Sequence, residues 1–161
     1  MNGSFKTPIL VLGLAGVLLS WPTARAQGDP AGFAQALPAD IKWAANPAIP
    51  AGGQTAVLLG DPRKAGPYVV RTKFPANYKM MSHTHPDDRT YTVISGTLSL
   101  GFGDKFEGAK LKSYPAGSVF TVPANAPHFN SSGASEVVFQ INSLGPSGTA
   151  YVNPADDPRK N

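Results

Sequence analysis

The amino-acid sequence predicts an all-β domain, either a sandwich or a barrel of short strands. Two observations support this prediction. The 161 residues include 17 glycines and 16 prolines, which interrupt short runs of residues that favour β-strands. Long stretches of helical periodicity are absent, so strands joined by turns are the better interpretation of the pattern.

The first expected strands are short runs that end at turn residues. Residues 41–43 are a candidate edge strand. The apolar run 55–59 is followed by the turn sequence Gly60-Asp61-Pro62. The run 68–74 is rich in β-formers and is followed by Pro75-Ala76-Asn77. We therefore expect three strands in the N-terminal half of the domain.

The remaining expected strands lie in the C-terminal half. Residues 90–95 alternate β-branched and aromatic side chains, and residues 97–102 follow directly after Gly96, which predicts a hairpin. Residues 118–122 lie between two proline-containing turns, and residues 136–142 form the last clear strand. The two faces of this last strand carry Phe139 and Gln140, and the sequence does not determine which face is inward.

The first 26 residues have the pattern of a cleaved secretory signal peptide. Lys6 supplies a positive charge, residues 8–20 are almost wholly apolar, and Ala24-Arg25-Ala26 resembles a cleavage site. The apolar run is shorter than the ~20 residues of a spanning helix, which argues against a stable membrane anchor. We therefore expect a periplasmic or secreted protein whose mature chain starts near Gln27.

The mature chain is long enough for one ordinary domain. We expect an N-terminal extension over residues 27–54, the barrel over 55–152, and a polar, solvated C-terminal tail over 153–161. Without the signal peptide, 12 basic residues balance 10 acidic ones, and they form no basic cluster. This composition predicts no nucleic-acid partner. The absence of cysteine excludes disulfides, thiolate metal sites and cysteine nucleophiles.

The chain has three histidines, and their spacing suits one metal site. His83 and His85 are two residues apart, so on a strand both side chains point to the same face. His128 is the remaining histidine and the candidate third ligand. Three neutral imidazoles suit one divalent transition metal, with iron, zinc, copper, manganese and nickel all open. Three protein ligands also leave a position for a small-molecule substrate.

These residues resemble the two motifs of the cupin superfamily. The first motif, G-x5-H-x-H-x3-E-x6-G, is matched here by Asn77, His83, His85, Arg89 and Gly96. The second motif, G-x5-P-x-G-x2-H-x3-N, is matched by Gly117, Pro123, Asn125, His128 and Ser132. The resemblance covers about residues 68–142. It implies a single-domain cupin with a double-stranded β-helix or jelly-roll barrel, and it implies a homodimer.

Two of the substitutions in the motifs are conservative for the fold. Asn77 and Asn125 replace glycines, and asparagine readily adopts the left-handed conformation that such turns need. Ser132 replaces the motif's asparagine, and Asn130 lies nearby. We therefore expect the turns to keep their shape.

Arg89 occupies the position at which the family commonly has a glutamate ligand. A guanidinium group has no lone pair for a metal, so the fourth ligand is either missing or supplied by Asp87 or Asp88. Arg89 either pairs with one of these aspartates or Asp104 at the barrel mouth, or it faces the cavity and clamps an anion. Strand parity places Tyr91 on the same face.

The resemblance implies two classes of function. One is a metal-dependent enzyme, most simply dioxygenase-like, in which Arg89 and Tyr91 position a small and anionic substrate. An isomerase, lyase or hydrolase remains open within this class, because the fold does not determine the chemistry. The other class is a non-catalytic protein that binds a metal or a small ligand.

Overall fold

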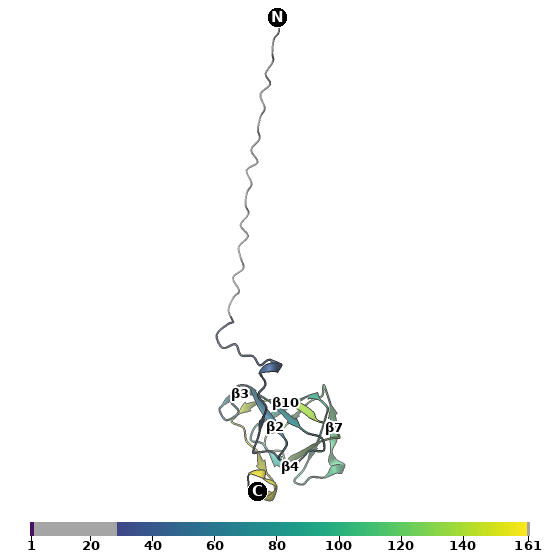
Figure 1. Cartoon of the computed structure of the whole chain (residues 1–161). Helices are drawn as coiled ribbons and strands as arrows, with labels where there is room; N and C mark the ends of the chain where they lie inside the picture. Colours follow the sequence, from purple (N-terminus) through teal and green to yellow (C-terminus); the bar gives the residue numbers. More distant parts are fainter. Residues whose placement is uncertain (2–28, 161) are drawn as a thin grey trace. The chain divides into compact units, whose positions relative to one another are not determined.

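The computed structural model describes Met1 and residues 29–160 of the chain. Apart from Met1, the predicted signal peptide lies outside these residues, so it stays a prediction. The chain divides into two compact units, Met1–Phe33 and Ala34–Asn161, and the second contains the strands (Figure 1). Among the described residues, no helix is long and apolar enough to cross a membrane.

The second unit is all-β, as the sequence predicts. Its strands are β1 (Ala44–Ala45), β2 (Gln54–Leu59), β3 (Gly66–Phe74), β4 (Lys79–Thr84), β5 (Arg89–Ser95), β6 (Thr97–Phe102), β7 (Lys112–Pro115), β8 (Val119–Val122), β9 (His128–Ser132), β10 (Val137–Gly145) and β11 (Ala150–Tyr151). Its helical segments are the 3-10 turns η1 (Pro38–Asp40), η2 (Gly108–Lys110), η3 (Pro154–Asp156) and η4 (Pro158–Lys160).

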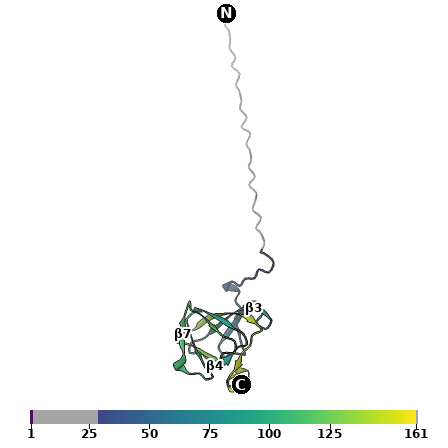
Figure 2. The same ribbon diagram turned by 180° about the vertical axis from the view of Figure 1, so that it is seen from behind.

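The strands form two antiparallel sheets. One has the order β1-β2-β3-β10-β5-β8 and the other has the order β11-β4-β9-β6-β7. Figure 1 shows β2, β3 and β10 close together in the first sheet, and Figure 2 shows β4 and β7 of the second sheet from behind. Since strands from distant parts of the sequence alternate within each sheet, the architecture is a double-stranded β-helix, as predicted.

The predicted hairpin around Gly96 is wrong. β5 pairs with β10 and β8, whereas β6 pairs with β7 and β9 in the other sheet. Gly96 therefore carries the chain from one sheet to the other. Its φ is 71°, and a Cβ there would lie 2.3 Å from the carbonyl oxygen of Glu136, so the position requires glycine. A single connecting residue is also shorter than the usual two-residue hairpin turn.

The sequence pattern also misplaced or missed several strands. The edge strand expected over 41–43 is β1, at Ala44–Ala45, although it does lie at the edge of its sheet. The strand pattern does not predict β4, β7, β9 or β11. All five residues of β9, His-Phe-Asn-Ser-Ser, are buried although four are polar, so the strand lacks the usual alternation of apolar and polar residues.

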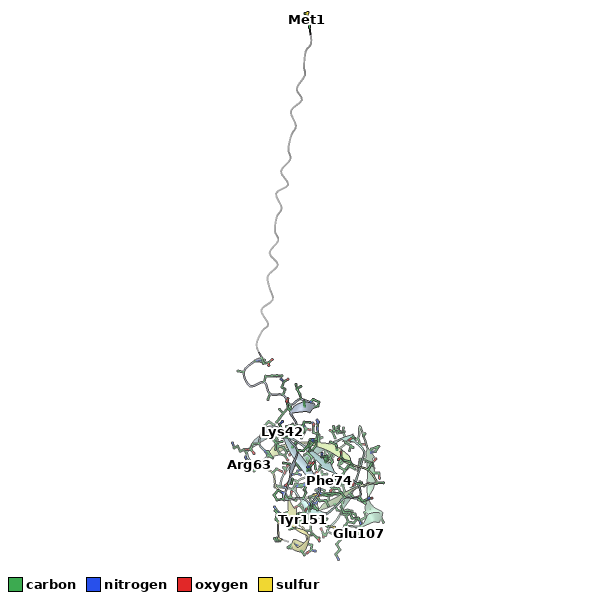
Figure 3. The ribbon with its side chains drawn as sticks, in the orientation of Figure 1. Met1, Lys42, Arg63, Phe74, Glu107 and Tyr151 are labelled. Carbon is green, nitrogen blue, oxygen red and sulfur yellow. The ribbon has the colours of Figure 1, made fainter. Side chains whose placement is uncertain are left out.

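The core lies between the two sheets. Its largest fully buried side chains include Tyr68, Phe74 and Tyr91 from the first sheet and Leu98 and Leu100 from the second. Figure 3 shows Phe74 inside the molecule, and its ring stacks on Tyr78 at 4.3 Å. On β10, Phe139 and Ile141 face this core. Gln140 faces outward, where its side-chain oxygen accepts a hydrogen bond from Arg71 at 2.8 Å.

The two asparagines that replace motif glycines are left-handed, as predicted. Asn77 has a φ of 58° and Asn125 a φ of 59°. The Asn125 backbone N–H also donates to the carbonyl oxygen of His85 at 2.7 Å. This hydrogen bond ties the turn of the second motif to the histidine pair of the first.

Replacing Asn125 with valine is expected to lower the free energy of unfolding by about 1–2 kcal/mol, because a β-branched residue is strained at positive φ. Asn125→Gly should change it by less than about 0.5 kcal/mol, since glycine adopts this conformation freely. Urea denaturation of both variants measures the difference. Equal stabilities would show that the left-handed turn is not what Asn125 contributes.

The C-terminal segment is not simply solvated, contrary to the expectation for residues 153–161. It forms η3 and η4, and Asp157 between them is 7% exposed. Arg159 donates to Asp157 at 2.7 Å and to the carbonyl oxygen of Thr149 at 3.0 Å. Two charged side chains therefore pair with each other and with the preceding loop, which brings Arg159 to the border of a cavity described below.

Candidate metal centre

The three histidines converge in the second sheet, as their spacing predicts. His83 lies on β4 directly opposite His128, the first residue of β9, and His85 follows the end of β4. All three side chains are buried, and one possible ligand atom from each lies within 4.8 Å of the others. The ring centroids are 4.3 to 5.1 Å apart. Neighbouring strands thus place three imidazoles around one point.

Backbone hydrogen bonds set the orientation of each ring. The Nδ1 atoms of His83, His85 and His128 lie 2.7, 2.7 and 2.9 Å from the carbonyl oxygens of Met81, Gly148 and Ala126, respectively. A carbonyl oxygen only accepts, so each Nδ1 carries the proton and each Nε2 keeps its lone pair. This is the tautomer that a ligand to a metal needs.

The donor set fits a divalent transition metal. The His128 Nε2 atom is buried and has no hydrogen-bond partner among the described residues. A buried polar atom without a partner is costly, and a bound cation would satisfy this lone pair. Among the described residues, the cluster of possible metal ligands contains the three histidines. It does not include Asp87 or Asp88.

Burial keeps the imidazoles neutral. It lowers the pKa of His83 to about 3, with the nearby His128 contributing, and it lowers the pKa of His128 to about 4. Burial and the charge of Arg89 also hold the pKa of His85 well below its usual range. At neutral pH the site therefore presents three uncharged donors and no proton has to leave before a metal binds.

The metal-free protein is expected to lose stability as the pH falls from about 6.5 towards 4. Histidines in the unfolded chain bind protons below about pH 6.5, whereas His83 stays neutral in the folded state until about pH 3. In this window, each such histidine lowers the free energy of unfolding by about 1.4 kcal/mol for every pH unit that the pH falls. Above the window, the histidine is neutral in both states and causes no loss of stability. Urea denaturation with a chelator, from pH 7.5 to 4.5, measures the slope.

A His83→Gln variant provides the comparison, because the carboxyl groups titrate equally in both proteins. Its unfolding free energy should depend less steeply on pH, by about one proton. An identical slope in the two proteins would show that His83 does titrate normally in the folded state.

Arg89 forms a buried ion pair with Asp87. The Arg89 Nε atom donates to Asp87 Oδ2 at 3.1 Å, and the two side chains are 10% and 3% exposed. Tyr68 and Ser143 also donate to this carboxylate, at 2.6 and 2.8 Å. Burial opposes ionisation of Asp87, but the hydrogen bond from Tyr68 and the charge of Arg89 prevail and lower its pKa. Asp87 is therefore an anchor for Arg89.

Asp88, the other candidate for a fourth metal ligand, is also engaged elsewhere. Asp88 Oδ1 accepts the backbone N–H of Ala124 at 2.7 Å. The pairing of Arg89 with Asp104 that the sequence left open is not formed, and Arg89 contacts Asp87 instead. The geometry thus favours a centre with three protein ligands.

A cavity of about 360 Å³ adjoins the histidines. The polar side chains that line it include His83, His85, Arg89, Tyr91 and Asn130. Its apolar wall includes Phe74, Phe139 and Ile141. Arg159 and Arg63 border it, and Figure 3 shows Arg63 extending outward at the surface. The cavity is therefore lined both by two of the potential metal ligands and by apolar side chains.

The two residues predicted to position a substrate, Arg89 and Tyr91, both line this cavity. Arg89 pairs with Asp87 and also lines the cavity, and its predicted binding of an anion stays a prediction. Tyr91 stacks on Phe120 with ring centroids 5.1 Å apart, and burial raises the pKa of its hydroxyl. Their roles in catalysis stay predictions.

Sequence reasoning missed the loop between β10 and β11. Ser147 Oγ accepts from Arg89 Nη2 at 2.5 Å and from the Tyr68 hydroxyl at 3.2 Å. Gly148 accepts from His85 through its carbonyl oxygen. The run Gly145-Pro146-Ser147-Gly148 signals a turn, but no local pattern reveals that its backbone orients a histidine 63 residues away.

Comparisons with known proteins show the fold. No family model matches the chain, and no curated protein matches it. Its structure is similar to an RmlC-like cupin from Shewanella frigidimarina, with 16% identity, a TM-score of 0.54, and coverage of 69% of this chain and 90% of that one. The chain has the cupin fold.

Two further cupin-like structures are enzymes. The polyketide cyclase RemF from Streptomyces resistomycificus has a TM-score of 0.65 and 16% identity, and the match covers 80% of this chain and 91% of that one. An oxalate oxidase has a TM-score of 0.51 and 20% identity, and the match covers 68% of this chain and 59% of that one. At these identities, the likeness establishes the shared fold of this chain and not its reaction.

Proposed function

We propose that the protein is an exported cupin metalloenzyme that acts on a small, anionic organic molecule with dioxygenase-like chemistry. His83, His85 and His128 bind one transition metal in this proposal. The observation that carries it is the convergence of three neutral imidazoles beside a cavity that also contains a buried guanidinium. The described part of the chain supplies no acidic ligand to offset the charge of the metal, so an anionic ligand complements the site.

The chain's own residues bind and orient the substrate. A metal held there would supply Lewis-acid chemistry and, with iron or copper, redox chemistry. Arg89 is held by Asp87 on one side and by Ser147 on the other, and it also lines the cavity. Its guanidinium group is therefore placed to bind a carboxylate there. The apolar wall formed by Phe74 and Phe139 limits the water beside the reacting groups.

A non-redox reaction, such as that of an isomerase, lyase or cyclase, is the second candidate. The similar structure of the polyketide cyclase RemF favours it, because that enzyme carries a different chemistry on the same fold. The three-imidazole donor set also suits zinc, which has no redox chemistry.

Oxygen uptake distinguishes the two candidates. Metal-depleted protein is reconstituted separately with iron, copper or zinc and is incubated with a panel of small carboxylic acids. We expect uptake with iron or copper that is lost in His128→Ala. Conversion that zinc supports without oxygen consumption would favour the second candidate. Failure of every metal to support conversion of any acid in the panel would favour a non-catalytic binding protein.

Export has its own test. Mass spectrometry of the protein recovered from the periplasm or medium should give a mature chain that starts at or near Gln27. Recovery of the uncleaved chain from the cytoplasm alone would contradict the proposed location and would leave the metal chemistry unaffected.

A further inference from the structure

Asn130 is a buried polar residue in the cavity that neither the fold nor the metal site uses. It lies on β9 two residues after His128, so both side chains point to the same side of the strand. The residue is 2% exposed and lines the cavity beside the histidines. Its position therefore directs an amide group into the space that the proposed substrate would occupy.

The fold leaves the oxygen of this amide without a hydrogen-bond partner among the described residues. The backbone of Asn130 is paired on both sides, opposite Met80 of β4 and Leu100 of β6. Its side-chain oxygen, in contrast, is buried and has no hydrogen-bond partner among the described residues. A buried acceptor without a donor opposes folding, and such groups in native proteins call for an explanation. An apolar residue would fill the same place without that cost.

We propose that Asn130 is a ligand-binding residue whose Oδ1 atom accepts a hydrogen bond from a hydroxyl group of the substrate. The inference rests on the proposed function in one respect, which is that the ligand carries an anionic group bound by Arg89. A neutral hydroxyl suits the position better than an ammonium group, because the Arg89 guanidinium and the proposed metal already make the cavity positive. The ligand class is therefore a hydroxylated carboxylic acid.

Matched pairs of probes test this proposal. The hydroxybenzoates are compared with the corresponding methylbenzoates, and phenol is compared with toluene, so that each pair differs only in a hydroxyl or a methyl group. Calorimetric titration of the metal-loaded protein should show at least one hydroxylated probe binding about tenfold more tightly than its partner, as expected for one buried hydrogen bond.

The variant Asn130→Leu, which preserves the size of the side chain, should abolish this preference. The metal content should stay unchanged, and the melting temperature without ligand should be equal or higher, because the unsatisfied acceptor is gone. Asn142→Leu is the matched control, since Asn142 is exposed on the outer face of β10 and should leave the preference intact. Asn130→Ala provides a second variant if the leucine prevents folding.

Three results would overturn the inference: no preference for hydroxylated probes in the wild type, a preference that survives in the Asn130 variants, or no binding of any probe. Loss of metal from Asn130→Leu would also overturn it, because the residue would then act as a ligand to the metal. A failure of the proposed function would give a different result. If hydroxybenzoates bind no better than phenol, Arg89 does not bind an anion. A preference for the hydroxylated probe of each pair would still support the role of Asn130.

Discussion

Replacing His128 with alanine is expected to abolish stable metal binding, and His83→Ala should do the same. The wild-type protein should bind about one transition metal per chain. Both residues are buried members of the histidine cluster, and their Nδ1 hydrogen bonds leave Nε2 as the ligand atom. Changing groups that only orient a ligand typically costs 10–100-fold in metal affinity, so loss of a ligand should cost more than about 100-fold. Metal analysis after dialysis against a weak chelator measures the stoichiometry.

Thr84→Ala is the matched control for these variants. Thr84 lies on the same strand as His83, but it points to the opposite face and is not part of the histidine cluster. Its metal content should equal that of the wild type. Circular dichroism of each variant shows whether the sheets are intact. Full metal occupancy in both histidine variants, with intact sheets, would rule out the three-histidine site.

Arg89→Met should lower the free energy of unfolding by about 3 kcal/mol. The substitution leaves the Asp87 carboxylate, 3% exposed, without its positive partner, and breaking one side of a buried ion pair is strongly destabilising. Methionine is preferred to glutamate here, because glutamate would place a second negative charge beside Asp87. Urea denaturation at pH 7 in the presence of a chelator measures this effect separately from metal binding.

The double variant Asp87→Asn/Arg89→Met should recover much of the lost stability. Its asparagine carries no charge, and it can still accept the hydrogen bond that Tyr68 donates to Asp87 at 2.6 Å. Binding of the hydroxybenzoates should be lost in the single and in the double variant, since the guanidinium is absent from both. Full stability in the single variant would show that the ion pair contributes little. Wild-type affinity for hydroxybenzoates in the double variant would show that Arg89 does not bind the anion.

The histidine site could be predicted because its information is local. His83 and His85 share a strand face through their spacing alone, and His128 completes the set as the remaining histidine. Asparagine at positions 77 and 125 likewise signals a left-handed turn without reference to the rest of the fold. Strands with apolar alternation, such as β3 and β10, were predicted for the same reason.

The missed features depend on contacts between distant segments. β9 is polar and fully buried, because it lies between β4 and β6 and carries His128 and Asn130 at the site. The connection at Gly96 was predicted as a hairpin from local turn chemistry, but the next strand pairs in the other sheet. The face of β10 that points inward also depends on packing, which places Phe139 inside and Gln140 outside.

The sequence by itself determined the all-β class, the resemblance to cupins and the three histidines, because these follow from composition and from spacing along the chain. The tertiary structure decided how the site is completed. It pairs Arg89 with Asp87, uses the loop at Gly148 to orient His85, and leaves the side-chain oxygen of Asn130 without a partner among the described residues. The physical reason is that hydrogen-bond partners and burial depend on which strands pair and pack together. Local sequence patterns do not show which distant strands will do so.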